Sequence, residues 1–301
     1  MQFMGYRRAD GRVGVRNYVL ILPGCACASE TCRLVASEVR GTKNVIMNVG
    51  CSDVQANTDM NLRVLTGFAL NPNVFGVIVI GLGCETVGHR ELAAKIRAET
   101  SKPVVSFGIQ EIGGTVATTA AAVKAAREMV AQASEQQREP CDASDLFVAI
   151  ECGGSDATSG IASNPAVGNM SDRIVDLGGT TMMSETIEFV GAEHILAKRG
   201  ATPEIHDQII RICEDYEKHL AGVGQDCRTG QPTTGNKAGG LSTIEEKSLG
   251  CIHKGGTRPV VEVLQEAARP TKKGALIMDT PGYDISSVTS MVAGGATMVV
   301  F

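Results

Sequence analysis

The stretch VFGVIVIGLG at residues 74–83 is an almost unbroken apolar run, and GHRELAAKIRAET at 88–100 follows it with apolar residues at helical spacing. A strand that is apolar on both faces, followed by an amphipathic helix, is typical of a parallel sheet covered by helices on both sides. The same order recurs through the first half of the chain. There the sequence predicts strands at 17–24, 44–50 and 102–109, and helices at 29–41, 57–70 and 114–137.

The second half repeats the alternation after SEQQREPCDASD at 134–145, where charge and a proline favour a domain boundary. We predict an α/β protein with two Rossmann-like open parallel-sheet domains, at residues 1–138 and 144–301, each with helices on both faces. Thr202 with Pro203 marks a helix start, and Ser242 with Glu245 has the spacing of a capping box. The predicted strands are 146–150, 179–188, 274–282 and 296–301, and the predicted helices are 164–178, 202–223, 242–250 and 286–295.

Composition excludes several classes of protein. Among the 301 residues, 43% are hydrophobic and the formal net charge is −5, which argues against a nucleic-acid groove because phosphate binding needs clustered Lys and Arg. No apolar stretch reaches the roughly 18 residues that span a bilayer, and the charged N-terminus does not resemble a secretory signal. We therefore expect a cytoplasmic protein whose ten cysteines are free thiols.

Four cysteines come at or just after predicted strands: Cys27, Cys51, Cys84 and Cys152. Loops at the carboxyl ends of parallel strands converge on a crevice, so thiolates from separate loops could meet at one ion. Soft sulfur ligands suit iron, zinc or an iron–sulfur cluster. The alternative is that each cysteine is a small buried residue.

Glycines surround these thiols in ECGGSDATSGIASNP (151–165) and GNKAGGLSTIEEKSLGCIHKGG (235–256), where backbone N–H groups can approach an anionic ligand. Lysines in the second stretch suit a carboxylate substrate. A nicotinamide enzyme is disfavoured, because GLGCETVG at 81–88 lacks a glycine at the third position of the dinucleotide fingerprint.

Five stretches of the sequence carry long, specific motifs: 5–23, 81–85, 151–168, 235–256 and 279–296. Together they resemble the UxaA family, which comprises altronate and galactarate dehydratases and the large subunit of sulfolactate sulfo-lyase. The resemblance implies a lyase that eliminates water or sulfite β to a carboxylate, needs Fe²⁺ or another divalent metal, and works with a small SAF-type domain or subunit. Family chains continue beyond VVF, so we expect the chain to be truncated at its C-terminus. MNVGCS (47–52) and CETVG (84–88) depart from the sugar-acid branch, which leaves the substrate open between a sugar acid and sulfolactate.

The resemblance and the residues together suggest a mechanism. A metal near the four cysteines and oriented N–H groups would stabilise the carbanion formed α to the carboxylate. We expect Lys247 or His253 to be the base and Asp156 or Glu185 the acid. We expect a homo-oligomer that binds a small anionic hydroxy acid, and the competing hypothesis is a non-catalytic metal- or ligand-binding subunit. The residues expected to hold the substrate are Gly153, Gly154, Ser155, Asn236 and Lys237.

Overall fold

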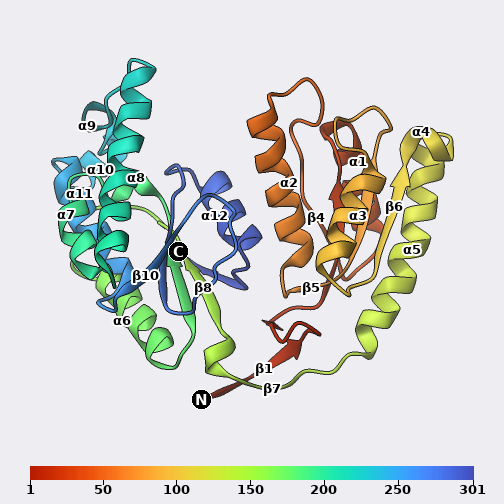
Figure 1. The fold of residues 1–301 in the computed structure, drawn as a ribbon, viewed down its shortest axis with the longest axis horizontal. Coiled ribbons are helices and arrows are strands. Elements are labelled where there is room, and N and C mark those ends of the chain that lie inside the picture. Colours follow the sequence, from red (N-terminus) through yellow and green to blue (C-terminus); the bar gives the residue numbers. More distant parts are fainter. The chain divides into compact units, whose positions relative to one another are not determined.

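A computed structural model describes residues 1–301, which divide into two compact units (Figure 1). The N-terminal unit is Gln2–Cys141, and the C-terminal unit is Asp142–Phe301 together with Met1. Each unit has its own sheet and its own hydrophobic cores. None of the helices combines the length and apolar character that crossing a membrane requires.

The N-terminal unit is built on four strands: β3 (Tyr18–Pro23), β4 (Thr42–Asn44), β5 (Val74–Gly81) and β6 (Val104–Gly108). Their order is β4-β3-β5-β6, and all neighbours are parallel. After β3 the chain adds β4 on one side of it and then β5 and β6 on the other side. The order of the strands therefore reverses between β3 and β5, and ligands collect at such switch points in open α/β sheets. A second, small sheet contains β1 (Gln2–Arg7), β2 (Val13–Gly14) and β7 (Glu139–Asp142).

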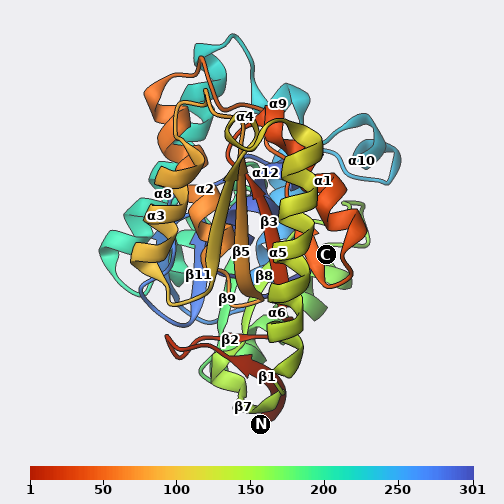
Figure 2. The ribbon, with the colours of Figure 1, turned by 90° about the vertical axis from the view of Figure 1, so that its right-hand side faces the viewer.

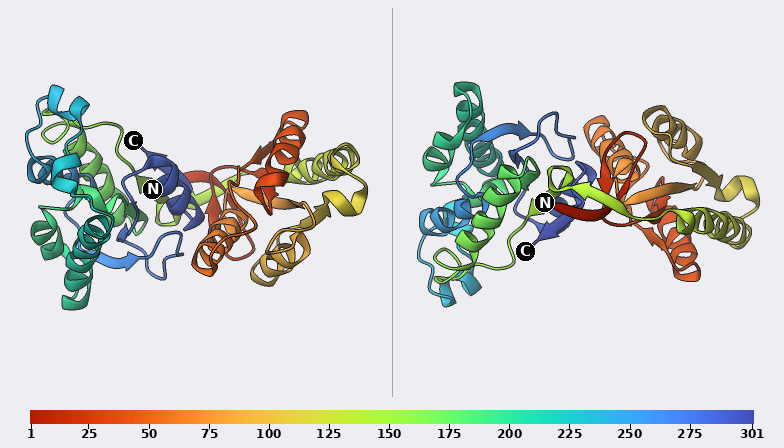
Figure 3. Two further views of the ribbon diagram at one scale, coloured as in Figure 1. Left: turned by 90° about the horizontal axis from the view of Figure 1, so that it is seen from above. Right: turned by 90° about the horizontal axis from the view of Figure 1, so that it is seen from below.

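Side chains alternate across this sheet and divide its core in two. Ile21 and Ile80 pack against α1 and α5 on one face, whereas Leu22 and Val79 pack against α2 and α3 on the other. Figures 2 and 3 show α1 and α5 on the opposite side of the strands from α2 and α3. The helices are α1 (Ala26–Glu38), α2 (Gln55–Leu70), α3 (His89–Glu99), α4 (Ile109–Ile112) and α5 (Thr115–Glu135).

The C-terminal unit holds five strands: β8 (Phe147–Ile150), β9 (Thr180–Met183), β10 (Val260–Leu264), β11 (Ala275–Met278) and β12 (Met298–Val300). They are ordered β10-β11-β9-β8-β12, and every neighbouring pair is parallel. The sheet is therefore the doubly covered parallel type that its continuous apolar strands favour.

Helices again cover both faces of this sheet. Ile150 and Ile277 face a core built with α8, whereas Ala149 and Leu276 face a core that includes Met291 of α12. The fold class predicted from the sequence, parallel α/β units with helices on both faces, is confirmed. The helices are α6 (Ser163–Asp176), α7 (Glu193–Leu196), α8 (Pro203–Gly222), α9 (Cys227–Gly230), α10 (Thr234–Ala238), α11 (Ile244–Cys251) and α12 (Asp284–Ala293), and the 3₁₀ turns are η1 (Ala143–Asp145), η2 (Thr186–Glu188), η3 (Ala197–Arg199) and η4 (Ile252–Gly255).

Three local predictions were wrong. The strand predicted at 44–50 ends at Asn44, because Met47 leaves the sheet edge and its backbone exchanges hydrogen bonds with the Ser29 hydroxyl of α1. Edge strand β10 was missed, since Glu262 interrupts its apolar run. The N-cap of α11 is Thr243, one residue after the predicted Ser242, and its hydroxyl accepts the N–H of Glu246.

Candidate active site

The candidate site lies at the carboxyl edge of the sheet in the C-terminal unit. Strands β8 and β9 pair in parallel with Ile150 opposite Met183, so Glu151 and Ser184 leave the sheet side by side. The Ser184 hydroxyl donates to Glu151 Oε2 at 3.0 Å, and the Ser287 hydroxyl of α12 donates to Oε1 at 2.5 Å. Glu151 is buried, and this burial raises its pKa despite the two hydrogen bonds. The first residue past β8 is thus a carboxyl group that ties three elements together.

Glu185 follows in a strained conformation. Its φ of 68° and ψ of 69° lie in the left-handed region, which is unfavourable for a residue with a long side chain. The Thr280 hydroxyl accepts its N–H at 2.9 Å, and Glu185 Oε2 accepts the N–H of Cys152 at 2.9 Å. The surrounding structure therefore holds a buried carboxyl group at a fixed position, at the cost of about 1 kcal/mol or more of backbone strain.

Two lysines meet two carboxyl groups next to Glu185. The Lys254 ammonium of η4 is buried, forms an ion pair with Glu188 in direct contact, and lies 3.6 Å from Glu185 Oε2. Lys247 of α11 places its Nζ 3.8 Å from Glu188 Oε1 and donates to Gln231 Oε1 at 3.1 Å. We call Cys152, Glu185, Glu188, Lys247 and Lys254 the edge cluster.

The two carboxyl groups of the edge cluster titrate in opposite directions. Burial, and then the charge of Glu188, raise the pKa of Glu185 to about 8. Burial would also raise the pKa of Glu188, but the contact with Lys254 outweighs it and lowers that pKa. Burial opposes the charge on Lys254, yet Glu188 outweighs this effect and raises the Lys254 pKa. The site therefore holds an ionised carboxylate beside one that keeps its proton at neutral pH, a pairing suited to acid–base chemistry.

Cys152 opens the loop that the sequence singled out. Its Sγ lies 3.5 Å from the Ser155 hydroxyl and accepts the N–H of Gly154 at 3.3 Å. Burial, followed by the charge of Glu188, raises the pKa of this thiol. The Asn236 side chain donates to the Ser155 carbonyl at 2.8 Å, which attaches the loop to α10. The loop is thus a shaped turn and not a free connection.

A cavity of about 250 Å³ lies between this loop and α11. Ser155 and Asp156 line one side, and Lys247, Cys251 and His253 line the other. A volume of this size accommodates a small hydroxy acid, and the cavity reaches the edge cluster through Lys247.

The predicted site residues fall into two groups in the C-terminal unit. Cys152, Glu185 and Lys247 share the edge cluster, and Ser155 lines the cavity. The remaining predicted residues lie outside the edge cluster, and two of them, Asp156 and His253, line the cavity together with Ser155. Asp156 is exposed and its carboxylate accepts N–H groups of its own loop, His253 is exposed on η4 at the cavity wall, Asn236 positions the loop, and Gly153, Gly154 and Lys237 are exposed.

Sequence reasoning missed Glu188, Lys254 and Glu151. Glu188 lies three residues after Glu185 within MSETIE, and Lys254 stands next to His253. Charged residues that directly follow an apolar strand are seldom buried unless they are paired, and that rule would have singled out Glu151, the first residue after β8.

Two groups of side chains could hold a metal ion, with ligand atoms all within 4.8 Å of one another. One is Cys152, Glu185 and Glu188, and the other is Glu151, Glu185 and Asp284. The first offers one thiol and two carboxyl groups against Lys254 and Lys247, so full ionisation leaves one more negative charge than positive. A mixed sulfur and oxygen donor set of this kind fits a divalent transition metal.

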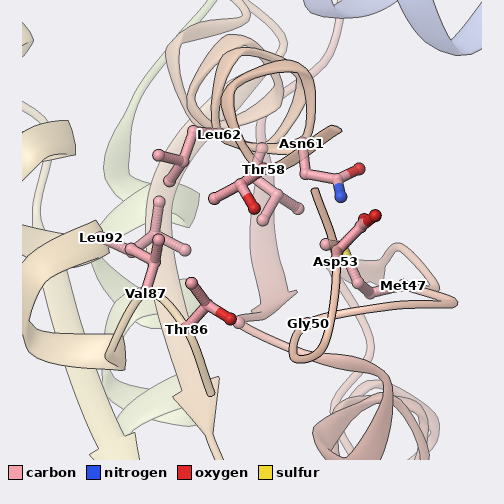
Figure 4. Close-up of a pocket in the computed structure, with 11 residues that line it drawn as sticks. Met47, Gly50, Asp53, Thr58, Asn61, Leu62, Thr86, Val87 and Leu92 are labelled. Atoms are coloured by element: carbon pink, nitrogen blue, oxygen red, sulfur yellow. The ribbon is translucent and has the colours of Figure 1, made fainter. Parts of the chain in front are cut away.

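The other three predicted metal ligands lie in the N-terminal unit. Cys27, Cys51 and Cys84 are exposed and belong to neither of these two groups. A nearby cavity of about 30 Å³ is lined on one side by Leu62, Val87 and Leu92 and on the other by Asp53 and Asn61 (Figure 4). It has room for little more than a water molecule, so it is too small for a hydroxy acid.

Comparison with known proteins identifies the family. The C-terminal domain of the D-galactarate/altronate dehydratases matches residues 143–301, and the second domain of the D-galactarate dehydratase/altronate hydrolase family matches residues 5–134. The chain is 41% identical to the (2R)-sulfolactate sulfo-lyase subunit beta of Chromohalobacter salexigens, over 97% of this chain and 75% of that protein.

Two further relatives are dehydratases. The chain is 33% identical to the altronate dehydratase of Bacillus subtilis and 35% identical to the galactarate dehydratase (L-threo-forming) of Escherichia coli. Each alignment covers 99% of this chain, which spans 61% of the length of either dehydratase. All three named relatives are lyases, in agreement with the resemblance found in the motifs. The chain belongs to the D-galactarate/altronate dehydratase family.

Proposed function

We propose that the protein catalyses β-elimination from a short 2-hydroxy acid at the edge cluster. The observation that carries this proposal is the meeting of two buried carboxyl groups and two lysines, all linked by contacts shorter than 4 Å, beside a cavity of about 250 Å³. Burying this many ionisable groups is costly, and such groups are retained where chemistry uses them.

β-Elimination from a 2-hydroxy acid requires a base, an acid and a group that stabilises the developing negative charge. A base removes the proton from the carbon next to the carboxylate, the β-substituent leaves with the electron pair of its bond to carbon, and the resulting enol becomes a 2-oxo acid. Lys247 and His253 line the cavity, and one of them is the base in this proposal. Glu185 carries the proton that a departing hydroxide needs. Lys254 supports the negative charge that develops on the substrate carboxylate.

The substrate carboxylate is assigned to the loop of Gly153, Gly154 and Ser155, with Lys237 as a further cation. The contact between Asn236 and the Ser155 carbonyl supports this assignment, because it fixes the loop against the wall of the cavity. Asn236 then positions the loop.

A divalent metal fits Cys152, Glu185 and Glu188. Full ionisation of these three groups leaves one more negative charge than Lys254 and Lys247 supply, so a divalent cation would change the net charge of the cluster from −1 to +1, which favours an anionic substrate. When bound, such an ion would take the place of the proton on Glu185 and would act in its stead, as a Lewis acid on the carboxylate and hydroxyl oxygens of the substrate.

Sulfolactate is the first candidate substrate, because the sulfolactate sulfo-lyase subunit has 41% identity to this chain against 33–35% for the two dehydratases. In that reaction sulfite leaves with the electrons of the C–S bond, and pyruvate forms after the α-proton is lost. Altronate and galactarate are the second candidates, supported by the two domain matches. Since that relative is named as a subunit, we also propose a partner subunit for this chain.

The test is an anaerobic elimination assay with ferrous iron, with and without the small partner. Sulfite release from sulfolactate, or 2-oxo acid from altronate or galactarate, identifies the leaving group. Lys247→Met and His253→Gln separate the two candidate bases, since only one should reduce kcat by about 100-fold or more. Lys218→Met on the exposed face of α8 is the matched control and should retain full activity. Metal binding without elimination from any of these acids would instead favour the non-catalytic binding subunit.

A further inference from the structure

A cavity of about 350 Å³ lies at the amino edge of the N-terminal sheet, where β5 and β6 begin. Segments that are far apart in the sequence build its wall. Arg8 follows β1, Phe75 is in β5, Lys102 lies between α3 and β6, and Gln136 follows α5. Figure 2 shows β1, β2 and the last turn of α5 at the same end of this unit. All of these segments belong to the N-terminal unit, so the cavity is complete within it.

Two basic side chains in this wall have no carboxylate partner. Arg8 is 9% exposed, and its guanidinium donates to two backbone carbonyl oxygens at 2.7 and 3.2 Å and to Gln136 Oε1 at 3.0 Å. The amino group of the half-buried Lys102 donates to the carbonyl oxygens of Ala69 and Asn71 at 3.0 and 2.7 Å. All of these acceptors are neutral. Arginine is seldom buried unless it is paired, so the missing counter-charge needs an explanation.

The two carboxylates in the wall do not supply this counter-charge. Asp10 Oδ2 accepts two N–H groups of the Arg12 guanidinium, at 2.9 and 2.7 Å, so its charge is already matched. Glu99 is exposed at the end of α3, and the exposed Arg7 in the same wall has the opposite charge. The excess positive charge of the wall therefore belongs to the two side chains without a partner.

Capping of α2 explains one of these two side chains. The carbonyl groups of Ala69 and Asn71 lie at the C-terminus of α2, which carries about half a negative charge and favours a cation. Lys102 therefore caps α2. Arg8 donates to neither of these carbonyl groups, so capping does not explain its burial.

The protonation of Lys102 reflects the positive charge around the cavity. Burial, and then the charges of Arg8 and Arg12, lower the pKa of this amine to about 6, and the opposing charge of Asp10 has a smaller effect. An anion inside the cavity favours the protonated amine and raises this pKa. The entry of an anion at neutral pH is therefore coupled to the uptake of a proton.

The wall also offers donors for the oxygens of an anion. A guanidinium has five N–H groups and a protonated amine has three, so Arg8 and Lys102 both keep N–H groups that the protein does not use. The hydroxyl groups of Thr100 and Ser101 belong to the same wall. These donors come from separate segments, which suits a tetrahedral oxyanion better than a planar carboxylate, for which one guanidinium is enough.

We propose that this cavity binds a small tetrahedral oxyanion with two negative charges, of the phosphate or sulfate type, between Arg8 and Lys102. Lys102 takes up a proton from solvent as the anion enters, and no covalent bond of the protein changes. The anion ties the turn after β1 to the segment between α3 and β6. The site lies in the N-terminal unit and stands independently of the reaction assigned to the edge cluster.

The test is isothermal titration calorimetry of the full chain with sulfate, whose charge does not change near neutral pH. At constant ionic strength in chloride we expect one saturable site per chain, for which inorganic phosphate competes. Glycerol 3-phosphate competes as well if the site accepts a phosphate group on a larger molecule, and it does not if the site takes only the free anion.

Proton uptake is measured by repeating the titration at pH 8 in two buffers with different ionisation enthalpies. We expect uptake of about one proton per sulfate, because Lys102 is uncharged at this pH in the empty cavity. No histidine or cysteine lines the cavity, so Lys102 is the side chain that takes up the proton. Binding of sulfate without proton uptake would refute its place beside Lys102.

Variants locate the site. Lys102→Met should weaken sulfate binding by about tenfold or more and abolish the proton uptake, and Arg8→Gln should weaken binding by a similar factor. The matched control is Arg97→Gln, because Arg97 is an exposed cation of α3 that donates to the Val104 carbonyl oxygen and does not line the cavity. This control should bind sulfate as the wild type does. Circular dichroism checks that each variant is folded.

Three results would overturn the proposal. The site does not exist if the folded wild-type chain shows no saturable sulfate binding. Succinate that binds as tightly as sulfate would mean a general attraction for dianions and not a site for a tetrahedral oxyanion. Full affinity in folded Lys102→Met would place the sulfate elsewhere. Arg8→Gln removes three hydrogen bonds, and if it does not fold, Lys102→Met and the proton count in the wild type still decide.

Discussion

The buried pair of Lys254 and Glu188 gives the sharpest prediction about stability. In Lys254→Met the ammonium is lost, and Glu188 stays buried with only Lys247, 3.8 Å away, as a cation. Breaking a buried ion pair from one side costs about 3–5 kcal/mol, because the remaining charge is desolvated and uncompensated. For a unit of this size each kcal/mol lowers Tm by about 2–4 °C, so we expect a fall of about 6–20 °C.

The double variant Lys254→Met/Glu188→Gln separates charge from packing. With both charges gone, no uncompensated ion remains, and we expect the free energy of unfolding to recover by about 2 kcal/mol or more relative to Lys254→Met. Lowering the pH to 5 should reduce the difference in free energy of unfolding between Lys254→Met and the double variant, because Glu188 can then take up a proton in Lys254→Met. The recovery is therefore a signature of the charge on Glu188.

The assay is urea unfolding followed by circular dichroism, at pH 7 and in the presence of a chelator. The wild-type chain, both single variants and the double variant complete a cycle that isolates the pair. Lys218→Met breaks only exposed ion pairs of α8, so it should stay within about 0.5 kcal/mol of wild type. If the double variant is as unstable as Lys254→Met, the loss comes from packing and the reasoning about the buried charge is refuted.

Three further predictions concern backbone strain, packing and pH. Glu185→Gly should be about 1 kcal/mol more stable than Glu185→Gln in urea unfolding, because glycine tolerates the left-handed conformation of this residue. Both variants should lose activity. Equal stability of the two variants would contradict the backbone strain at Glu185. Gly168→Ala should cost about 1–3 kcal/mol, since its Cβ would lie 2.1 Å from the His253 carbonyl oxygen, whereas Gly222→Ala has open space and should be neutral in the same measurement. Burial lowers the pKa of Lys102 to about 6 in the folded chain, against about 10.4 in the unfolded chain. Between about pH 6 and about pH 10.4 only the unfolded chain binds this proton, so the free energy of unfolding should rise by up to about 1.4 kcal/mol per pH unit. Urea unfolding curves measured across this pH range should show no such rise for Lys102→Met. If the free energy of unfolding depends on pH in the same way in the variant and the wild type, Lys102 keeps its proton in the folded chain.

Most of the fold could be predicted from the sequence. The runs at 17–24 and 74–83 are apolar on both faces, and only burial between two layers of helices accounts for such strands. The strands β4 and β10 were harder to predict, since they lie at the edges of their sheets, where strands bury less surface and carry a weaker apolar pattern. A hydroxyl on a neighbouring helix, Ser29, decided where the chain left the sheet at Met47.

The candidate site was only partly predictable. Cys152, Glu185 and Lys247 carried a signal because they stand beside glycines or strand ends. Glu188 and Lys254 did not, since nothing in the order of residues tells that positions 66 apart form an ion pair. Their pairing depends on η4 packing against the end of β9, a contact that exists only in the folded chain.

The sequence by itself determined the layers of each unit, the free thiols and the family, because apolar periodicity, cysteine placement and long motifs are local properties of the chain. The tertiary structure alone decided which carboxyl groups are buried, which of them keeps its proton and which thiols reach solvent. The physical reason is that pKa values and exposure depend on desolvation and on charges brought within a few ångströms from distant segments.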